Sequence, residues 1–250
     1  MTTTPPAAIT LNAVSKRFSA DGPTILETID LRVEQGEFVC LLGASGCGKS
    51  TILNLIAGLD HPSSGSITVP GGPVAMMFQD PALLPWLTAS RNVELALEFS
   101  GVSRPERRER VRSLLELVSL SHAGDRRPHQ LSGGMRQRVA LARALAQDSS
   151  VLLMDEPFAA IDAITRDNLH RELERIWRHT RQAVVFVTHN VREALRLGQR
   201  IVLLHAGPGR FGAEWNVPDA VRTGADPLET ARLEGEITRT LRGELSEHAA

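Results

Sequence analysis

Short runs of apolar residues alternate with stretches of helical periodicity along this chain. The apolar runs predict strands, which we place at 9–14, 38–42, 74–78, 151–154, 184–187 and 201–204. The last four are nearly continuous in Val, Leu, Ile, Met and Phe, which is typical of strands covered on both faces. The pattern therefore predicts an α/β fold with a mostly parallel core sheet and an antiparallel N-terminal β portion.

The pattern changes between residues 80 and 130, which carry no strand signal. Residues 83–99 and 105–120 have helical periodicity, and we predict an inserted α-helical subdomain at about 82–135. A dense basic run at 104–112 suggests a phosphate-binding surface, but its interleaved glutamates favour a solvated helix face.

The signals weaken toward the C-terminus. We predict a short tail at 206–250 that is turn-rich at first and then helical at 228–241. Leu233, Ile237 and Leu241 form a thin apolar stripe on this helix. Such a stripe favours packing on its own domain over binding a partner.

Composition narrows the class of protein. The formal net charge of −1 gives no reason to expect nucleic-acid binding, and no apolar run approaches the ~18 residues of a membrane span. The start of the chain lacks the basic and then apolar layout of a signal peptide. Two cysteines give no disulfide framework, so we expect a reduced, cytosolic compartment. For Cys47 we favour a small residue that fills a loop over a redox switch.

A glycine-rich segment follows the predicted strand at 38–42 and opens a helical pattern at 50–59. It consists of Gly43, Ala44, Ser45, Gly46, Cys47, Gly48, Lys49, Ser50 and Thr51. Glycines let consecutive backbone N–H groups approach one set of phosphate oxygens at the positive end of a helix dipole. Lys49 adds a charge for the outer phosphates, and Ser50 adds a hydroxyl for Mg²⁺. The segment predicts a P-loop NTPase that binds a nucleoside triphosphate.

Two acidic residues at the end of a predicted strand indicate how a bound nucleotide would be hydrolysed. The apolar run at 151–154 ends in Asp155 and Glu156. In a P-loop fold, such an aspartate reaches the Mg²⁺ shell beside Ser50. The adjacent glutamate can hold and deprotonate the water that attacks the γ-phosphate, which predicts hydrolysis.

A second glycine-bearing turn precedes a helical run at 136–146. Ser132, Gly133 and Gly134 lie at the start of this helix and form an anion site by the same physics, but without a lysine. The economical explanation is that this turn completes a nucleotide pocket on another subunit.

With these motifs in order, the chain resembles the ATP-binding subunit of an ABC transporter over nearly all of residues 9–205. The further motifs are Phe-Gln-Asp at 78–80, Leu-Ser-Gly-Gly at 131–134, Ala-Ala-Ile-Asp at 159–162 and Thr-His at 188–189. The resemblance implies an ABC ATPase domain at 8–205 that binds ATP and Mg²⁺.

The resemblance also implies roles for individual residues. Phe18 stands where the family has an aromatic ring that stacks on adenine, and the alternative is a phenylalanine of the core. Gln79 resembles the glutamine that touches Mg²⁺ or the attacking water and reports to the membrane subunit. Glu156 resembles the catalytic base, and His189 resembles the histidine that contacts the γ-phosphate.

The signature turn carries a role toward a second molecule. Ser132 and Gly134, with Gly133 between them, would face the γ-phosphate of ATP bound to the partner, and Asp162 would link the two sites. Three residues depart from the family pattern, namely Met135 for glutamine, Ile161 for leucine and Asn190 for aspartate. We expect activity to survive all three.

Finer likeness, carried by the segments 78–88, 155–166 and 207–210, is to the nitrate, sulfonate and taurine branch of bacterial importers. The branch implies a head-to-tail homodimer with integral membrane permease subunits, and indirectly a periplasmic or lipid-anchored solute-binding protein. It places the chain at the cytoplasmic face of the inner membrane. In the family, the region of Trp86 lies near a groove for a short helix of the membrane subunit. The alternative is simple packing between the two subdomains, and the two roles are compatible.

Three alternatives stay open. An exporter or lipoprotein-releasing ATPase shares the fold, but segments 81–88 and 207–210 argue against it by analogy. A soluble ABC ATPase that acts on ribosomes or DNA usually carries two cassettes or a long coiled coil, and neither is evident in this sequence. A P-loop kinase would have no use for the turn at 132–134. The solute stays unassigned, because nitrate, sulfonates, taurine, bicarbonate or a pyrimidine precursor would all fit.

Overall fold

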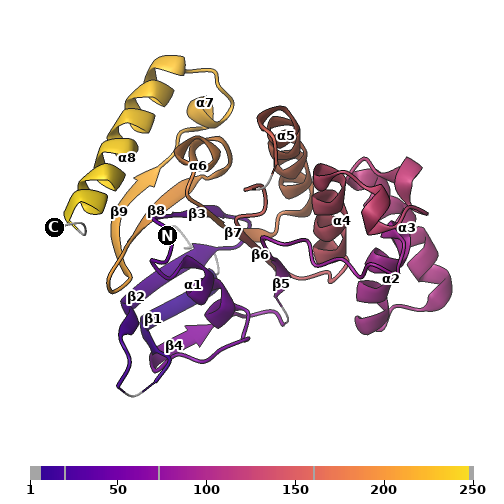
Figure 1. Ribbon diagram of the computed structural model, residues 1–250, viewed down its shortest axis with the longest axis horizontal. Helices are drawn as coiled ribbons and strands as arrows, with labels where there is room; N and C mark the ends of the chain where they lie inside the picture. Colours follow the sequence, from indigo (N-terminus) through magenta and orange to yellow (C-terminus); the bar gives the residue numbers. More distant parts are fainter. Residues whose placement is uncertain (1–6, 20, 73, 160, 248–250) are drawn as a thin grey trace, which may run out of the picture. The chain divides into compact units, whose positions relative to one another are not determined.

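The computed structural model describes residues 7–19, 21–72, 74–159 and 161–247. They form two compact units, whose helices and strands are labelled in Figure 1. The first unit combines the chain up to Gly72 with the chain from Arg181 onward, and the second spans residues 73–180.

An antiparallel sheet forms the N-terminal part of the first unit. It consists of β1 (Ala7–Arg17), β2 (Thr24–Glu34) and β4 (Ser64–Thr68), in the order β2-β1-β4. The predicted antiparallel N-terminal portion is confirmed. The sequence prediction contained only one of these strands, although β2 alternates apolar and polar residues in its second half. β4 offers little signal, because Ile67 is its one large apolar residue.

A parallel core completes the first unit. β3 (Phe38–Leu42) lies between β7 (Ala183–Thr188) and β8 (Arg200–His205) and runs parallel to both. Every residue of β3 and β7 is buried, which explains why these runs are continuously apolar. α1 (Lys49–Ile56) contacts β7, and α6 (Val191–Leu197) contacts β3 and β7. The predicted parallel core is confirmed.

The tail contains more regular structure than the turn-rich stretch and single helix that we predict. β9 (Arg210–Asn216) pairs with β8 in antiparallel fashion, and it is followed by α7 (Asp219–Arg222) and α8 (Pro227–Glu247). The prediction was wrong for this strand because glycine and charged residues interrupt its weak alternation of Phe211 and Trp215. An edge strand of this kind gains its order from pairing with β8.

The last helix packs on its own unit. α8 lies beside α6 and α7 (Figure 1), and it contacts both. Leu233 and Ile237 are buried, and the indole Nε1 of Trp215 donates to Glu236 at 2.8 Å. The predicted apolar stripe therefore faces the domain.

The second unit is mostly helical. β5 (Ala75–Met77) and β6 (Val151–Asp155) pair in parallel. The helices are α2 (Ala89–Phe99), α3 (Arg104–Leu117), α4 (Gly133–Leu145) and α5 (Ala163–Thr180), with two 3₁₀ turns at Ser121–Ala123 and Pro128–Gln130. α4 contacts α2, α3, α5 and β5, so it is the central helix of this unit. The described residues between β5 and β6 contain no strand, which confirms the helical subdomain.

Helix α2 starts six residues later than predicted from residue 83, because a polar network holds the preceding segment out of the helix. Thr88 caps α2, accepting from the N–H of Arg91 at 3.2 Å. Buried Asn92 accepts from the N–H of Leu84 at 2.8 Å, and its Nδ2 donates to the carbonyl of Thr88 at 3.0 Å. These bonds satisfy the backbone of a turn that contains Pro85.

Helix α3 carries the basic run. Its arginines pair with nearby acids, with Arg107 at 2.7 Å from Glu98 and Arg112 at 3.0 Å from Glu109. Most of the helix surface is exposed. The predicted solvated, charge-paired face is confirmed. The helix itself ends at Leu117, slightly before the predicted end at 120.

Candidate functional site

The glycine-rich segment forms a tight loop between β3 and α1. Gly46 and Gly48 have positive φ values of 82° and 104°, which side-chain-bearing residues rarely adopt. A Cβ on Gly43 would lie 2.5 Å from the carbonyl oxygen of Leu204, and one on Gly48 would lie 2.6 Å from Leu26 Cδ2. Glycine is therefore required at Gly43 and Gly48 by packing.

Lys49 is held against the inside of this loop. Its side chain is 5% exposed, and Nζ donates to the carbonyls of Gly43 at 3.0 Å and Ala44 at 2.7 Å. By contrast, Ser45, Gly46 and Ser50 are exposed. The charge is thus held inside the loop by two carbonyls, while Ser45, Gly46 and Ser50 on its rim are accessible.

His189 follows the strand next to the phosphate loop. In the β3–β7 ladder, Leu42 lies opposite Thr188, so the phosphate loop and His189 leave neighbouring strands at the same sheet edge. His189 is exposed, whereas Thr188 is buried. The carboxyl ends of parallel strands are the usual place for ligands in such sheets.

Asn190 caps the helix that follows. Its Oδ1 accepts from the backbone N–H groups of Arg192 at 2.9 Å and Glu193 at 3.3 Å. An amide oxygen does this as well as the carboxylate that is usual in the family, so this departure from the family pattern leaves the helix start intact.

The acidic strand end lies in the second unit. Asp155 is the last residue of β6, and Glu156 follows it with a positive φ of 41°. Both residues are half-buried. A non-glycine residue in the left-handed region carries backbone strain, which is concentrated at functional sites in proteins.

The signature turn begins α4. Ser132 is the N-cap, and its hydroxyl accepts from the N–H of Met135 at 3.3 Å. Ser132 and Gly133 are exposed, whereas a Cβ on Gly134 would lie 2.6 Å from Thr165 Cγ2. Met135 contributes a backbone donor to the cap, so its side chain is not needed for this function. The exposed N-terminus of a helix with no acid in its first turn is suited to an anion.

A family model for the ABC transporter matches residues 26–159. The taurine import ATP-binding protein TauB of Chromobacterium violaceum is 44% identical over 231 residues, which span 86% of this chain and 88% of TauB.

The chain belongs to the ABC transporter family.

Other relatives agree on the branch. The nitrate import ATP-binding protein NrtD of Synechococcus elongatus is 43% identical, with 82% of this chain and 81% of NrtD covered. The bicarbonate transport ATP-binding protein CmpD of a Synechocystis species is 46% identical, with 81% of this chain and 76% of CmpD covered. The resemblance found in the sequence is confirmed, including the branch.

Solved structures agree on the fold. The ATP-binding cassette MJ0796, in a dimeric post-hydrolysis state bound to ADP and Pi, has a TM-score of 0.74 and 34% identity. The match covers 84% of this chain and 99% of that cassette. The predicted P-loop ATPase fold is confirmed. Within the described residues, no helix is long and apolar enough to cross a membrane.

Phe18, the residue expected to stack on adenine, has an exposed aromatic ring. The side chain is 68% exposed, which rules out the alternative of a core phenylalanine. Lys16 Nζ lies 5.1 Å from the ring centroid, and it is fixed by Asp60 Oδ1 at 2.6 Å and the carbonyl of His61 at 2.8 Å. The same lysine lowers the pKa of Asp60. The ring is thus supported by a cation–π contact while most of its surface stays open.

Asp162 is exposed and immediately precedes α5. Its carboxylate accepts from the N–H of Thr165 at 3.0 Å, and this bond lowers the pKa of Asp162. Ile161, the second departure in this motif, is buried. Ala160 lies outside the described residues.

Gln79 is exposed, and the chain after it is tied to the signature helix α4. Gln137 Nε2 donates to the carbonyl of Gln79 at 3.0 Å. The Arg143 guanidinium donates to the carbonyls of Pro81 at 2.7 Å and Ala82 at 2.8 Å. Two side chains of α4 therefore hold the segment that begins with Gln79.

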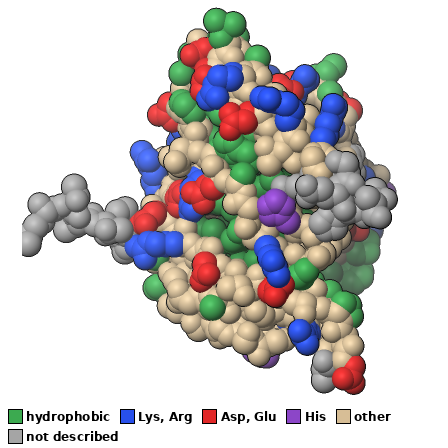
Figure 2. Space-filling model, turned by 90° about the vertical axis from the view of Figure 1, so that its left-hand side faces the viewer, with side chains coloured by type: hydrophobic (Ala, Val, Ile, Leu, Met, Phe, Trp, Pro, Cys, Tyr) green, Lys and Arg blue, Asp and Glu red, His purple; other side chains and the backbone are tan. Residues whose placement is uncertain are grey.

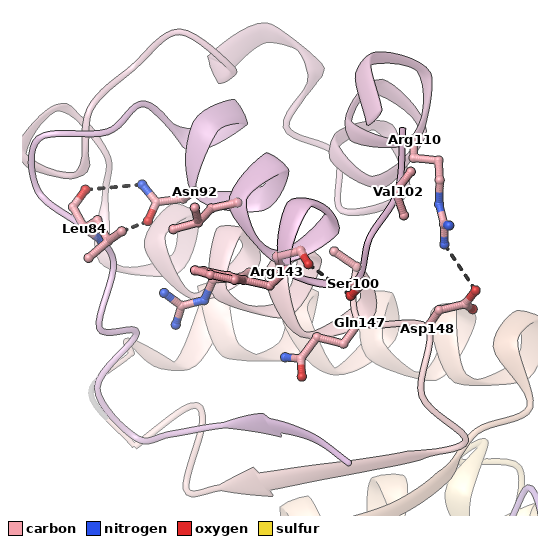
Figure 3. A pocket seen from close by; sticks show the side chains of 12 residues that line it. Leu84, Asn92, Ser100, Val102, Arg110, Arg143, Gln147 and Asp148 are labelled. Atoms are coloured by element: carbon pink, nitrogen blue, oxygen red, sulfur yellow. Dashed lines mark hydrogen bonds and ion pairs between the residues drawn. The ribbon is translucent and has the colours of Figure 1, made fainter. Parts of the chain in front are cut away.

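A groove of about 660 Å³ opens beside this segment (Figure 3). Its apolar lining includes Leu84, Leu95 and Val102, and Arg143 and Gln147 of the α4 side also face it. At its edge Phe99 is 84% exposed. Trp86 is 66% exposed and does not line the groove, so packing within the unit does not account for it.

Sequence reasoning missed the residues that support the phosphate loop from outside the motif. Gly209 donates its N–H to Ile25 at 2.8 Å and accepts from the N–H of Glu27 at 2.9 Å. A Cβ on Gly209 would lie 2.5 Å from the carbonyl of Cys47. In the sequence, the segment 207–210 indicates only the branch. Its contact with the loop depends on pairing between residues far apart in the chain, which leaves no local signal.

Both cysteines are buried. Burial raises the pKa of the Cys40 thiol, with a smaller contribution from Glu193. Cys47 packs beneath the phosphate loop, where a Cβ on Gly43 would lie 2.8 Å from its sulfur. The interpretation of Cys47 as a small residue that fills the loop agrees with this packing.

Proposed function

We propose that this chain is the ATP-hydrolysing subunit of a bacterial importer for a small solute of the taurine, nitrate or bicarbonate type. The observation that carries the proposal is the coexistence of two anion-binding helix starts, one with a buried lysine and one exposed and without a lysine. The class of solute is supported by the names of three relatives, which are a taurine import, a nitrate import and a bicarbonate transport ATP-binding protein.

Nucleotide binding uses the first unit. The Phe18 ring stacks on adenine, because a flat exposed ring offers area at little entropic cost. The backbone N–H groups of residues 43–51, from Gly43 through Gly48 to Thr51, surround the phosphates, and Lys49 neutralises the outer charge.

The metal site uses oxygen ligands. Ser50, Gln79 and Asp155 supply a hydroxyl, an amide oxygen and a carboxylate, and this is a donor set that suits Mg²⁺. When bound there, Mg²⁺ would supply positive charge that offsets the negative charge developing during phosphoryl transfer.

Hydrolysis uses residues at strand ends. Glu156 accepts a proton from the attacking water, and Gln79 orients that water. His189 donates a hydrogen bond to the γ-phosphate, which fixes it for in-line attack. The proton passes to Glu156 as the oxygen–phosphorus bond forms, and ADP leaves with the bridging oxygen.

The signature turn serves a second copy. Two chains meet head to tail, and the exposed donors of Ser132, Gly133 and Gly134 face the γ-phosphate held by the partner. Asp162 links the two sites. ATP binding closes the dimer and hydrolysis opens it, because the nucleotide favours the closed state by its contacts on both sides.

The groove beside Gln79 meets the integral membrane permease. Its apolar lining and the exposed rings of Phe99 and Trp86 suit an amphipathic helix laid across it. The chain would thus sit at the cytoplasmic face of the inner membrane, and a periplasmic or lipid-anchored solute-binding protein would select the solute. The formal net charge of −1 gives no electrostatic reason to propose nucleic acid as a partner. Figure 2 shows acidic and basic side chains interspersed on one face.

The experiment that tests the proposal is Glu156→Gln in the full chain. The variant should keep ATP binding, lose most turnover and accumulate an ATP-bound dimer in size-exclusion chromatography, since the amide cannot take the proton. Near-normal hydrolysis would remove Glu156 as the base. Purification of the chain from its native membranes in mild detergent tests the importer role, which fails if the main companions are ribosomal or DNA-associated.

A further inference from the structure

The residue before His189 carries a hydroxyl that bridges both sides of the histidine. Thr188 is 2% exposed, and its Oγ1 donates to Glu193 Oε2 at 2.5 Å. The same oxygen accepts from the N–H of Asn190 at 3.0 Å. One hydroxyl thus ties the residue before His189 to the residue after it, so the backbone of His189 is closed into a small ring.

Glu193 fixes the other end of this hydroxyl. The side chain is 6% exposed and lies in the first turn of α6, whose start is capped by Asn190. A carboxylate that accepts a short bond from a hydroxyl forms a stronger bond than a neutral acceptor.

The anchor is tied to the phosphate loop by the sheet. Thr188 lies opposite Leu42, the residue that precedes Gly43. A buried ladder position cannot shift without breaking strand pairing, so the bridge transmits the rigidity of the sheet to an otherwise exposed histidine. A simple helix cap would need only Asn190, which already accepts two N–H bonds. The Thr188 hydroxyl therefore does something beyond capping.

We propose that Thr188 and Glu193 form a positioning pair that holds His189 where its imidazole meets the γ-phosphate. The inference rests on the proposed role of His189 in hydrolysis. Glu193 holds the Thr188 hydroxyl, and that hydroxyl holds the backbone on both sides of His189. The pair restricts the histidine before ATP binds, so its contribution is to turnover and not to nucleotide affinity.

The first test compares Thr188→Val with Thr188→Ser in the full chain. Valine keeps the shape and removes the hydroxyl, whereas serine keeps it. Thr188→Val should lower kcat for ATP hydrolysis between about tenfold and a hundredfold, with KM for ATP changed by less than about twofold. Thr188→Ser should stay close to the unchanged chain. Equal rates for the two variants, or a loss confined to KM, would overturn the proposal.

The second test asks whether the effect passes through His189. In a His189→Ala background, Thr188→Val should cause no further loss of kcat, because the group that it positions is gone. A loss that multiplies with that of His189→Ala would show a separate structural effect and overturn the positioning role. A normal kcat for His189→Ala alone would instead remove the histidine from the mechanism, and the inference with it.

A second variant covers the case in which Thr188→Val unfolds. Glu193→Ala removes the acceptor and leaves the hydroxyl, so it should reproduce the loss of kcat and its dependence on His189. Thermal unfolding of each variant separates a loss of fold from a loss of turnover. Glu193→Ala with a normal kcat in a folded chain would contradict the proposal.

Discussion

The phosphate loop and the signature turn both place glycines at a helix N-terminus, yet their surroundings differ. In the phosphate loop, Gly43 and Gly48 are crowded by other parts of the chain, and Lys49 is buried against two loop carbonyls. In the signature turn, Ser132 and Gly133 are exposed, and a Cβ on Gly133 would meet nothing closer than Arg136 Nη2 at 3.9 Å.

The difference teaches how to tell a complete anion site from half of one. The phosphate loop has its walls and its counter-charge within one chain, so it is preorganised for phosphate. The signature turn has donors and a helix dipole, and Thr165 crowds Gly134 while Arg136 lies near Gly133, but Ser132 and Gly133 are exposed and the turn holds no buried lysine. Such a turn gains strength only when a second surface excludes water from it. Substitutions at matched glycines can therefore separate binding by one chain from assembly of two.

The largest effect should come from Gly43→Ala, compared with Gly133→Ala. A methyl group at Gly43 would lie 2.5 Å from a backbone carbonyl, so the loop must move. We expect ATP affinity of the single chain, measured by calorimetry, to fall by about a hundredfold or more. Gly133→Ala should leave this affinity unchanged, because the methyl group would meet only Arg136 Nη2, at an ordinary contact distance of 3.9 Å.

Turnover completes the comparison of these two glycines. Gly133→Ala should still lower the ATP hydrolysis rate and the ATP-dependent dimer population, since the methyl group would stand between the turn and the partner's phosphate. Similar losses of single-chain affinity in both variants would contradict the distinction between a complete and a half site. Circular dichroism of both variants checks that the fold is kept.

A smaller effect on ATP affinity is expected from Gly209→Ala, which tests the segment that packs against the phosphate loop from outside. The methyl group would lie 2.5 Å from the carbonyl of Cys47, and Gly209 is bonded to β2 through Ile25 and Glu27. We expect ATP affinity to fall by about tenfold, because the loop is displaced from outside and keeps its own residues.

The matched control is Gly235→Ala in α8, where an added Cβ meets nothing within 4 Å. It should leave ATP affinity unchanged and raise the free energy of unfolding by about 0.5–1 kcal/mol. If Gly209→Ala bound ATP as tightly as this control, the segment 207–210 would be no more than a structural loop.

The contrast between local motifs and contacts made only in the folded chain also explains which features could be predicted from the sequence. The phosphate loop, the acidic strand end and the signature turn could be predicted because each is a contiguous segment at the end of a strand or the start of a helix. Continuous apolar runs predicted the strands β3, β6, β7 and β8, because a strand that is buried on both faces needs apolar residues at nearly every position. The roles of Glu156 and His189 stay predictions that depend on the family.

Features set by particular side-chain contacts and strand pairings, between near or distant residues, were not predicted. Helix α2 starts at Ala89 because Asn92 folds back onto Leu84, and nothing in the periodicity of residues 83–99 reports this. β9 is ordered by its pairing with β8. The wall at Gly209 and the bridge from Thr188 to Glu193 depend in the same way on contacts that only the folded chain provides.

The smallest effect on ATP binding should come from Ser132→Ala, with Ser132→Thr as its control. Alanine removes the oxygen that accepts from the N–H of Met135 at 3.3 Å, and threonine keeps an oxygen there. Loss of such a cap costs about 1 kcal/mol, which lowers Tm by about 2–4 °C in a chain of this size. Single-chain ATP affinity should not change for either variant, because the turn is not part of that chain's own phosphate site. Dimer formation by Glu156→Gln should weaken when Ser132→Ala is added and survive when Ser132→Thr is added, and a reduced single-chain affinity in Ser132→Ala would mean that the turn serves its own nucleotide after all.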